Sequence, residues 1–207
     1  MGAMEKGIER LRGVLADGDV ISARHRALTV LKLATLFFRL GDFRRADSLF
    51  EEGFRSASTI DPDEHLLALN ERAALKTFLG DYTEATRLCD EGLEIGSTHE
   101  TPRVREVTMN LVATRANIAL RRLDYSAAIA GFESALDIAD AIGLEANRAV
   151  VLNNLGITLS QCDRYAEAIR CFQEAEQTCL KLDAGPSLLS IYANLSVLHA
   201  RTGAFDE

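Results

Sequence analysis

Four stretches of the chain share one short phrase, in which small or polar residues precede an aromatic residue and an alanine follows three positions later. They are GDFRRA at 41–46, GDYTEA at 80–85, LDYSAA at 123–128 and DRYAEA at 163–168. A fifth copy begins with GAFDE at 203–207. The aromatic residues are spaced 39, 43, 40 and 40 residues apart, at Phe43, Tyr82, Tyr125, Tyr165 and Phe205. A fixed period in this range is typical of stacked supersecondary units, each unable to bury its apolar face alone.

Apolar residues on both sides of each phrase recur at spacings of three and four. Before the first phrase they include Val30, Leu33 and Phe37, and after it Ala46 and Phe50. This spacing predicts helices rather than strands, because the 3.6-residue period holds and strict alternation does not. Each unit is therefore predicted to be a pair of helices.

The phrase itself is predicted to be the turn between the two helices. Gly41 can adopt the left-handed conformation that ends a helix, and Asp42 can accept backbone N–H bonds at the start of the next. So short a connection predicts an antiparallel hairpin. Between units, Asp61-Pro62 and Thr101-Pro102 place a capping side chain before a proline, which begins a new helix.

The unit at 153–177 carries these features most fully, with Leu155-Gly156 before the turn and Tyr165, Ala168, Phe172 and Ala175 after it. It resembles the tetratricopeptide repeat. The period near 40 resembles the longer variety found in kinesin light chains, LGN-type polarity adaptors and bacterial regulators of the Rap and MalT kinds. The resemblance implies an all-α fold, a right-handed α-solenoid of antiparallel hairpins with about ten helices. Arg72, Arg115 and Lys76 depart from the family's pattern, which places apolar or aromatic residues there.

The phase of the repeat predicts the organisation of the chain. Residues 1–4 have the look of an expression scar, and 5–18 are predicted to be a capping helix or the second helix of a preceding repeat. Four repeats are expected at 19–60, 61–100, 101–144 and 145–184. Residues 185–207 are then the first helix of a truncated fifth repeat, which suggests that the sequence is a segment of a longer protein.

Composition narrows the class of protein. The chain has 31 acidic and 23 basic residues, a net charge of −8, and 47% hydrophobic residues without a long apolar block. This predicts a cytoplasmic globular protein that neither inserts into a membrane nor binds nucleic acid. The four cysteines form no CxxC pair and are expected to be free thiols, so neither metal nor cofactor is predicted; they are Cys89, Cys162, Cys171 and Cys179.

The sequence contains no recognisable catalytic motif: there is no phosphate-binding glycine loop, no Ser-His-Asp context and no HExxH. The four histidines lie far apart in sequence, and His199 is interpreted as a packing residue. We therefore expect a protein that is not an enzyme.

A binding face is expected on the first helices, which line the concave side in the family that the chain resembles. An asparagine amide offers both a donor and an acceptor to an extended backbone, and arginine recognises carboxylates. The resemblance implies peptide binding by such asparagines. The candidate residues are Arg39, Asn70, Asn117, Arg121, Asn153, Asn154, Asn194 and Arg201.

Alternatives remain open at this point. The asparagines could be solvated or local helix-end residues, the arginines solvated, and a partner could use the convex face, the ends or a missing part of the protein. Two functions are considered: an interaction scaffold of a larger bacterial signalling or polarity adaptor, with a protein, peptide or acidic partner, and a ligand- or peptide-sensing domain of a bacterial transcriptional or kinase regulator.

Overall fold

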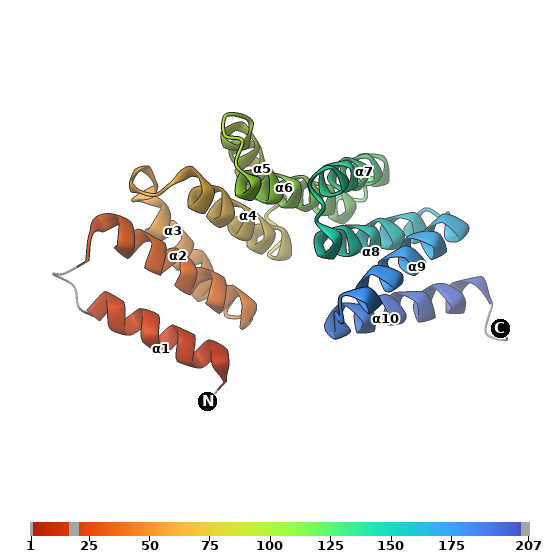
Figure 1. Ribbon diagram of the computed structural model, residues 1–207, viewed down its shortest axis with the longest axis horizontal. Coiled ribbons are helices and arrows are strands. Elements are labelled where there is room, and N and C mark those ends of the chain that lie inside the picture. The colour runs from red at the N-terminus through yellow and green to blue at the C-terminus, as the bar shows by residue number, and fades with distance from the viewer. Residues whose placement is uncertain (1, 17–20, 204–207) are drawn as a thin grey trace. The chain divides into compact units, whose positions relative to one another are not determined.

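The computed structural model describes residues 2–16 and 21–203, and these form ten α-helices, one short 3₁₀ helix and no strand (Figure 1). The all-α fold expected from the sequence is confirmed. Met1 of the suspected expression scar and Phe205 of the fifth phrase lie outside the described residues. The helices are α1 (Ala3–Ala16), α2 (Ala23–Arg39), α3 (Phe43–Phe54), η1 (Ala57–Thr59), α4 (Pro62–Phe78), α5 (Tyr82–Ser97), α6 (Pro102–Arg121), α7 (Tyr125–Ile142), α8 (Glu145–Gln161), α9 (Tyr165–Lys181) and α10 (Gly185–Thr202).

The chain divides into two compact units, Met1–Glu100 and Thr101–Glu207. Unit 1 contains α1 to α5, and unit 2 contains α6 to α10. Thr101 is the first residue of unit 2 and caps the start of α6, where its hydroxyl accepts the backbone N–H of Val104 as the sequence pattern predicts. At the other predicted cap, Asp61 precedes Pro62 but makes no capping bond with its side chain.

Each recurring phrase forms the turn of a helical hairpin. Gly41 and Gly80 have φ values of +80° and +82°, and the side chain of Asp42 accepts the backbone N–H of Arg45. The turn predicted from Gly41 and Asp42 is thus observed. In the hairpins of unit 2 the left-handed position is filled by Leu123 (φ 61°) and Asp163 (φ 59°) instead of glycine.

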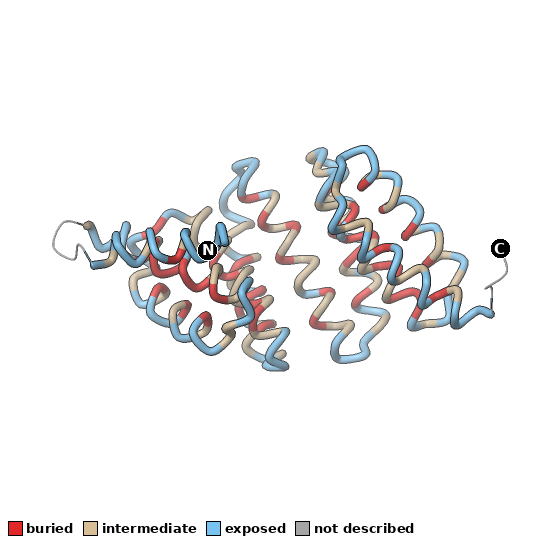
Figure 2. Tube along the Cα trace, turned by 90° about the horizontal axis from the view of Figure 1, so that it is seen from below, coloured by how far each residue is buried: buried red, intermediate tan, exposed pale blue. Residues whose placement is uncertain are grey.

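The hairpins of unit 2 pack through small residues. A Cβ atom at Gly131 of α7 would lie 2.8 Å from Cβ of Ala116 in α6, and one at Gly156 of α8 would lie 2.7 Å from the ring of Phe172 in α9. Phe132 and Phe172 are completely or almost completely buried. Figure 2 shows that buried residues recur at intervals along the helices, among partly buried and exposed ones. The small residues therefore let the two helices of a hairpin approach closely and leave room for an aromatic ring.

Charged side chains replace part of the apolar packing in unit 1. Lys76 of α4 donates to Asp47 of α3 at 2.8 Å, and Arg72 of α4 lies 3.4 Å from Glu51 and 4.0 Å from Glu84. The guanidinium of Arg72 also lies over the ring of Phe54. Arg72 and Lys76, two of the three basic residues that depart from the repeat pattern, are thus accommodated by carboxylates on the neighbouring helices α3 and α5.

All four cysteines are free, and Cys89 and Cys179 are buried. Burial raises the pKa of the Cys171 and Cys179 thiols above its ordinary value.

In the described part of the chain no helix is both long enough and apolar enough to cross a membrane. In the same residues, no group of three or more His, Cys, Asp or Glu side chains lies close enough together to hold a metal ion.

Candidate partner-binding face

Two pairs of asparagines connect the first helices of consecutive hairpins in unit 2. Nδ2 of Asn147 in α8 donates to Oδ1 of Asn110 in α6 at 3.1 Å. Nδ2 of Asn194 in α10 donates to Oδ1 of Asn153 in α8 at 2.9 Å. All four side chains are half-buried, so each amide lies at the surface of the helix that carries it. The helices α6, α8 and α10 therefore share a face that carries a line of amide groups.

The predicted asparagines of unit 2 differ in what they contact. Asn153 and Asn194 are brought together by the second pair. Asn117 instead donates to the carbonyl oxygen of Ala113, one turn earlier in α6, at 3.1 Å. Asn154 is half-buried, and its backbone carbonyl oxygen accepts a hydrogen bond from the hydroxyl of Thr158 within α8.

The predicted arginines of unit 2 are placed at the C-terminal ends of first helices, where a positive charge is favourable. Arg201 of α10 donates to Oγ of Ser160 and to Oδ1 of Asp163, each at 3.2 Å, and its guanidinium lies 5.5 Å from the centre of the Tyr165 ring. It thus fastens α10 to the turn between α8 and α9. Arg121, at the end of α6, is exposed.

An apolar side chain stands beside the second asparagine pair. Val197 of α10 follows Asn194 by three residues, so both lie on the same side of the helix. Its exposed fraction is 59%. The face lined by α6, α8 and α10 therefore combines amide groups with an exposed apolar contact.

In unit 1 the first helices α2 and α4 carry Arg39 and Glu71, which lie 3.5 Å apart. Burial raises the pKa of Glu71, and the positive charge of Arg39 opposes that shift. Asn70 precedes Glu71 in α4 and is half-buried. The side chain of Arg39 is 60% exposed, and its contact with Glu71 is made by one guanidinium nitrogen, Nη2.

Aromatic rings lie at the turn end of the same two helices. The ring centres of Phe43 and Phe78 are 4.4 Å apart, and those of Phe38 and Phe43 are 6.1 Å apart. Phe78 is 61% exposed. Unit 1 thus carries an exposed aromatic contact on α4.

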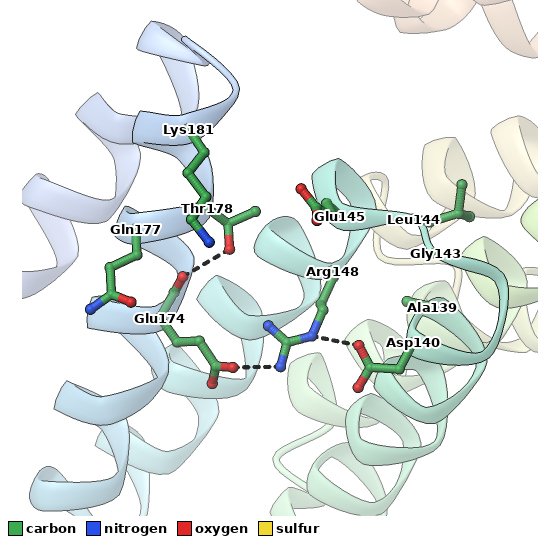
Figure 3. Close-up of a pocket in the computed structure, with 10 residues that line it drawn as sticks. All are labelled: Ala139, Asp140, Gly143, Leu144, Glu145, Arg148, Glu174, Gln177, Thr178 and Lys181. Atoms are coloured by element: carbon green, nitrogen blue, oxygen red, sulfur yellow. Dashed lines mark hydrogen bonds and ion pairs between the residues drawn. The ribbon is translucent and has the colours of Figure 1, made fainter.

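A hollow of about 430 Å³ lies on unit 2, between the end of α7, the start of α8 and the last two turns of α9 (Figure 3). Arg148 lies at its centre, 2.6 Å from Oδ1 of Asp140 and 2.5 Å from Oε1 of Glu174. These two carboxylates already form ion pairs with the guanidinium of Arg148. This arginine is therefore not free to bind an anionic ligand in the hollow.

Sequence reasoning missed Arg148 and the pair formed by Asn110 and Asn147. Arg148 lies in the first turn of α8, outside the recurring phrase. The two asparagines are 37 residues apart, close to one repeat, and this spacing is the signal that could have suggested a contact between consecutive first helices.

Comparison with known protein families gives two overlapping matches to the tetratricopeptide repeat, at residues 106–181 and 147–207. No curated protein matches the chain. Solved structures match nearly all of it at low sequence identity, which establishes a shared fold.

Three of these structures illustrate the range of matches. A Rap protein complexed with competence and sporulation factor has a TM-score of 0.80 at 14% identity, over 96% of this chain and 55% of that one. PlcR from Bacillus thuringiensis, in complex with the peptide PapR7 and DNA, has a TM-score of 0.75 at 13% identity, over 94% and 68% of the two chains. BtubC (BKLC) from P. vanneervenii has a TM-score of 0.71 at 22% identity, over 98% and 83%.

The chain thus spans about half the length of the Rap protein that it matches. Its hairpins, their small-residue contacts and the family matches over unit 2 agree with one another. Together they identify the chain as a tetratricopeptide repeat protein.

Proposed function

We propose that the chain is a non-enzymatic interaction module that binds an extended segment of a protein partner on the face lined by α6, α8 and α10. The observation that carries the proposal is the line of asparagine amides on this face. In the pair of Asn153 and Asn194, one amino group and one carbonyl oxygen bond each other. The amino group of Asn153 and the carbonyl oxygen of Asn194 stand outside that bond.

These remaining groups suit a peptide backbone, which presents both N–H donors and C=O acceptors whatever its sequence. The exposed Val197 would give an apolar side chain of the partner a contact beside the amides. The net charge of −8 favours a protein over a nucleic acid as partner. A carboxylate of the partner would find Arg121 exposed, whereas Arg39 and Arg201 already face Glu71 and Asp163.

The wider role proposed is that of a scaffold within a larger bacterial signalling or polarity adaptor. The alternative is the sensing domain of a bacterial regulator. The matched Rap protein and PlcR were each solved with a factor or peptide bound, which supports peptide binding as a use of this fold in either setting.

Site-specific photo-crosslinking tests which face binds. Benzoylphenylalanine placed at Val197 should crosslink to a partner from the source cells, and mass spectrometry should identify the attached segment. The matched control is Leu180 of α9, which is 58% exposed but lies on a second helix. Crosslinking of the same partner from position 180 and not from 197 would show that the partner binds elsewhere.

The crosslinked segment, made as a labelled peptide, then tests the asparagines by fluorescence anisotropy. Asn153→Ala and Asn194→Ala should each weaken binding about three- to tenfold, since a net hydrogen bond contributes about 0.5–1.5 kcal/mol. Because these residues also connect α8 to α10, the melting temperature of each variant reports the structural share of the effect. Unchanged affinity in both variants would rule out the asparagine contacts.

A further inference from the structure

The amide-bearing face of unit 2 carries a second exposed apolar side chain, Val150 of α8. It lies three residues after Asn147 and three before Asn153, so it shares their side of the helix. Its exposed fraction is 52%, close to the 59% of Val197 in α10. The helix α8 is bonded to α6 through Asn147 and to α10 through Asn153, and Val150 stays uncovered between these two contacts.

The exposure of Val197 is a property of its position in the repeat. Its counterpart 40 residues earlier is Ile157 of α8. Ile157 is only partly buried, although α8 is followed by α10 and bonded to it. A further first helix beside α10 would therefore not bury Val197 completely.

Two hydrogen bonds show how α8 and α10 are aligned. The bond between Asn153 and Asn194 joins residues 41 positions apart, and so does the bond between Ser160 and Arg201. The two bonds are about two helical turns apart along each helix. An equal offset at both points means that α8 and α10 run in the same direction and keep one register.

This register places the two valines on opposite sides of the asparagine pair. Val150 precedes Asn153 by three residues, and Val197 follows Asn194 by three. Six residues of helix correspond to about 9 Å along the axis, and packed helices lie about 8–10 Å apart. The valines are thus separated by about 12–13 Å, on a diagonal that crosses both helices.

In an extended peptide, one spacing of side chains matches this separation. Each residue of an extended chain adds about 3.3 Å, and successive side chains point to opposite sides. Residues i and i+4 are therefore about 13 Å apart and share a side, whereas residue i+2 is only about 6.6 Å from residue i and residue i+3 points away. The backbone at residue i+2 would then cross the amino group of Asn153 and the carbonyl oxygen of Asn194.

We propose that the face binds extended peptides with two apolar side chains four residues apart, one placed on Val150 and the other on Val197. This inference rests on the proposed binding of an extended segment to the face, and it adds the spacing of the residues that the segment must carry. Either direction of the peptide fits, because the spacing is the same in both.

A library of random peptides, each about 12 residues long and displayed on bacteriophage, tests the spacing without a known partner. After selection on the full chain, pairs of apolar residues at i and i+4 should be enriched over the unselected library more than pairs at any other spacing. Enriched sequences without a preference for this spacing would overturn the inference.

One enriched peptide, made with a fluorescent label, tests the two valines by fluorescence anisotropy. Val150→Ser and Val197→Ser should each weaken binding about three- to tenfold, since the contact removes part of each valine from water. Both positions are exposed, and serine and valine have similar helix propensities, so the fold should be retained. The matched control is Leu180→Ser, at a position of α9 that is 58% exposed, and it should bind like the unmodified chain. Equal affinity of all three variants would contradict the proposed contacts.

A change in the peptide tests the spacing directly. Moving one of its apolar residues from i+4 to i+3 turns that side chain away from the helices, and should weaken binding about tenfold. Undiminished binding of the altered peptide would overturn the inference.

The variant Asn153→Ala separates this inference from the proposed function. Peptides that lack the spacing but bind Asn153→Ala more weakly than the unmodified chain would leave the proposed face in place and overturn the spacing alone. Peptides that bind Asn153→Ala and both serine variants at full strength would contradict the proposed face as well, and so would a selection that enriches no peptide.

Discussion

Gly156 of α8 lies very close to the ring of Phe172 in α9. Gly156 has no room for a Cβ because three ring atoms of Phe172 would lie 2.7–3.0 Å from it, and Phe172 is itself buried. Gly13 of α1 is the opposite case, since a Cβ there would meet nothing within 4 Å. An alanine at position 13 should therefore change only the helix propensity, whereas an alanine at position 156 should also crowd the packing between α8 and α9.

We expect Gly13→Ala to raise the melting temperature and Gly156→Ala to lower it. Alanine in an open helical position stabilises by up to about 1 kcal/mol relative to glycine. At position 156 this gain is outweighed by overpacking against a buried ring, which costs about 1–3 kcal/mol. Thermal unfolding followed by circular dichroism measures both. A rise of similar size in the two variants would show that α8 and α9 separate readily to admit a methyl group.

Among the helices, α4 packs on α3 and α5 partly through the charged side chains of Arg72 and Lys76, at positions where the repeat pattern has apolar or aromatic residues. The side chains of Arg72 and Lys76 are each 11% exposed, and that of Asp47 is 26% exposed. Oδ1 of Asp47 and Nε of Arg72 are both buried, and neither makes a hydrogen bond. The two atoms lie 3.8 Å apart and form an ion pair with each other. The cluster is therefore sensitive to the loss of any one member.

Asp47→Ala should destabilise unit 1 by about 1–3 kcal/mol, because it leaves the largely buried Lys76 without its carboxylate. The double variant Asp47→Ala/Lys76→Met removes both partners of the bond and should recover part of the loss. Urea unfolding measures the two free energies of unfolding. If the double variant is the less stable of the two, Lys76 has another partner that compensates for Asp47.

Much of the helical pattern could be predicted from the sequence because it is local. Gly41 and Asp42 encode a turn within two residues, and Thr101 with Pro102 encodes a helix start. The partners of Arg72 and the bond between Asn153 and Asn194 join residues from different helices. They depend on how far one helix is shifted along the next, which no short stretch of sequence determines.

The same distinction applies to the candidate site. The sequence predicts Asn153 and Asn194 as binding residues because of their amides, but it predicts neither their bond to each other nor the pairing of Arg201 with Asp163. The turn at Leu123 shows a further limit. It adopts a left-handed conformation without glycine, so the recurring phrase predicted the position of that turn although its chemistry differs.

At the scale of the whole molecule, the two units each have their own apolar core. The core of unit 2 is built within α6 to α10 and includes Phe132 and Phe172, while that of unit 1 includes Phe37 and Phe50. In repeat proteins, stability is approximately a sum over repeats and the interfaces between neighbours. A cut between the units should therefore remove less stability than a cut inside a hairpin.

We expect a fragment of residues 101–207 to fold alone, with a helical circular dichroism spectrum and a cooperative thermal transition. A control fragment of residues 125–207 lacks α6, and so loses the contact between Ala116 and Gly131 together with the first asparagine pair. It should melt at a lower temperature and less cooperatively, since α7 then keeps an uncovered apolar side. Equal stability of the two fragments would mean that α6 contributes little to unit 2, and an unfolded 101–207 would mean that its core depends on unit 1.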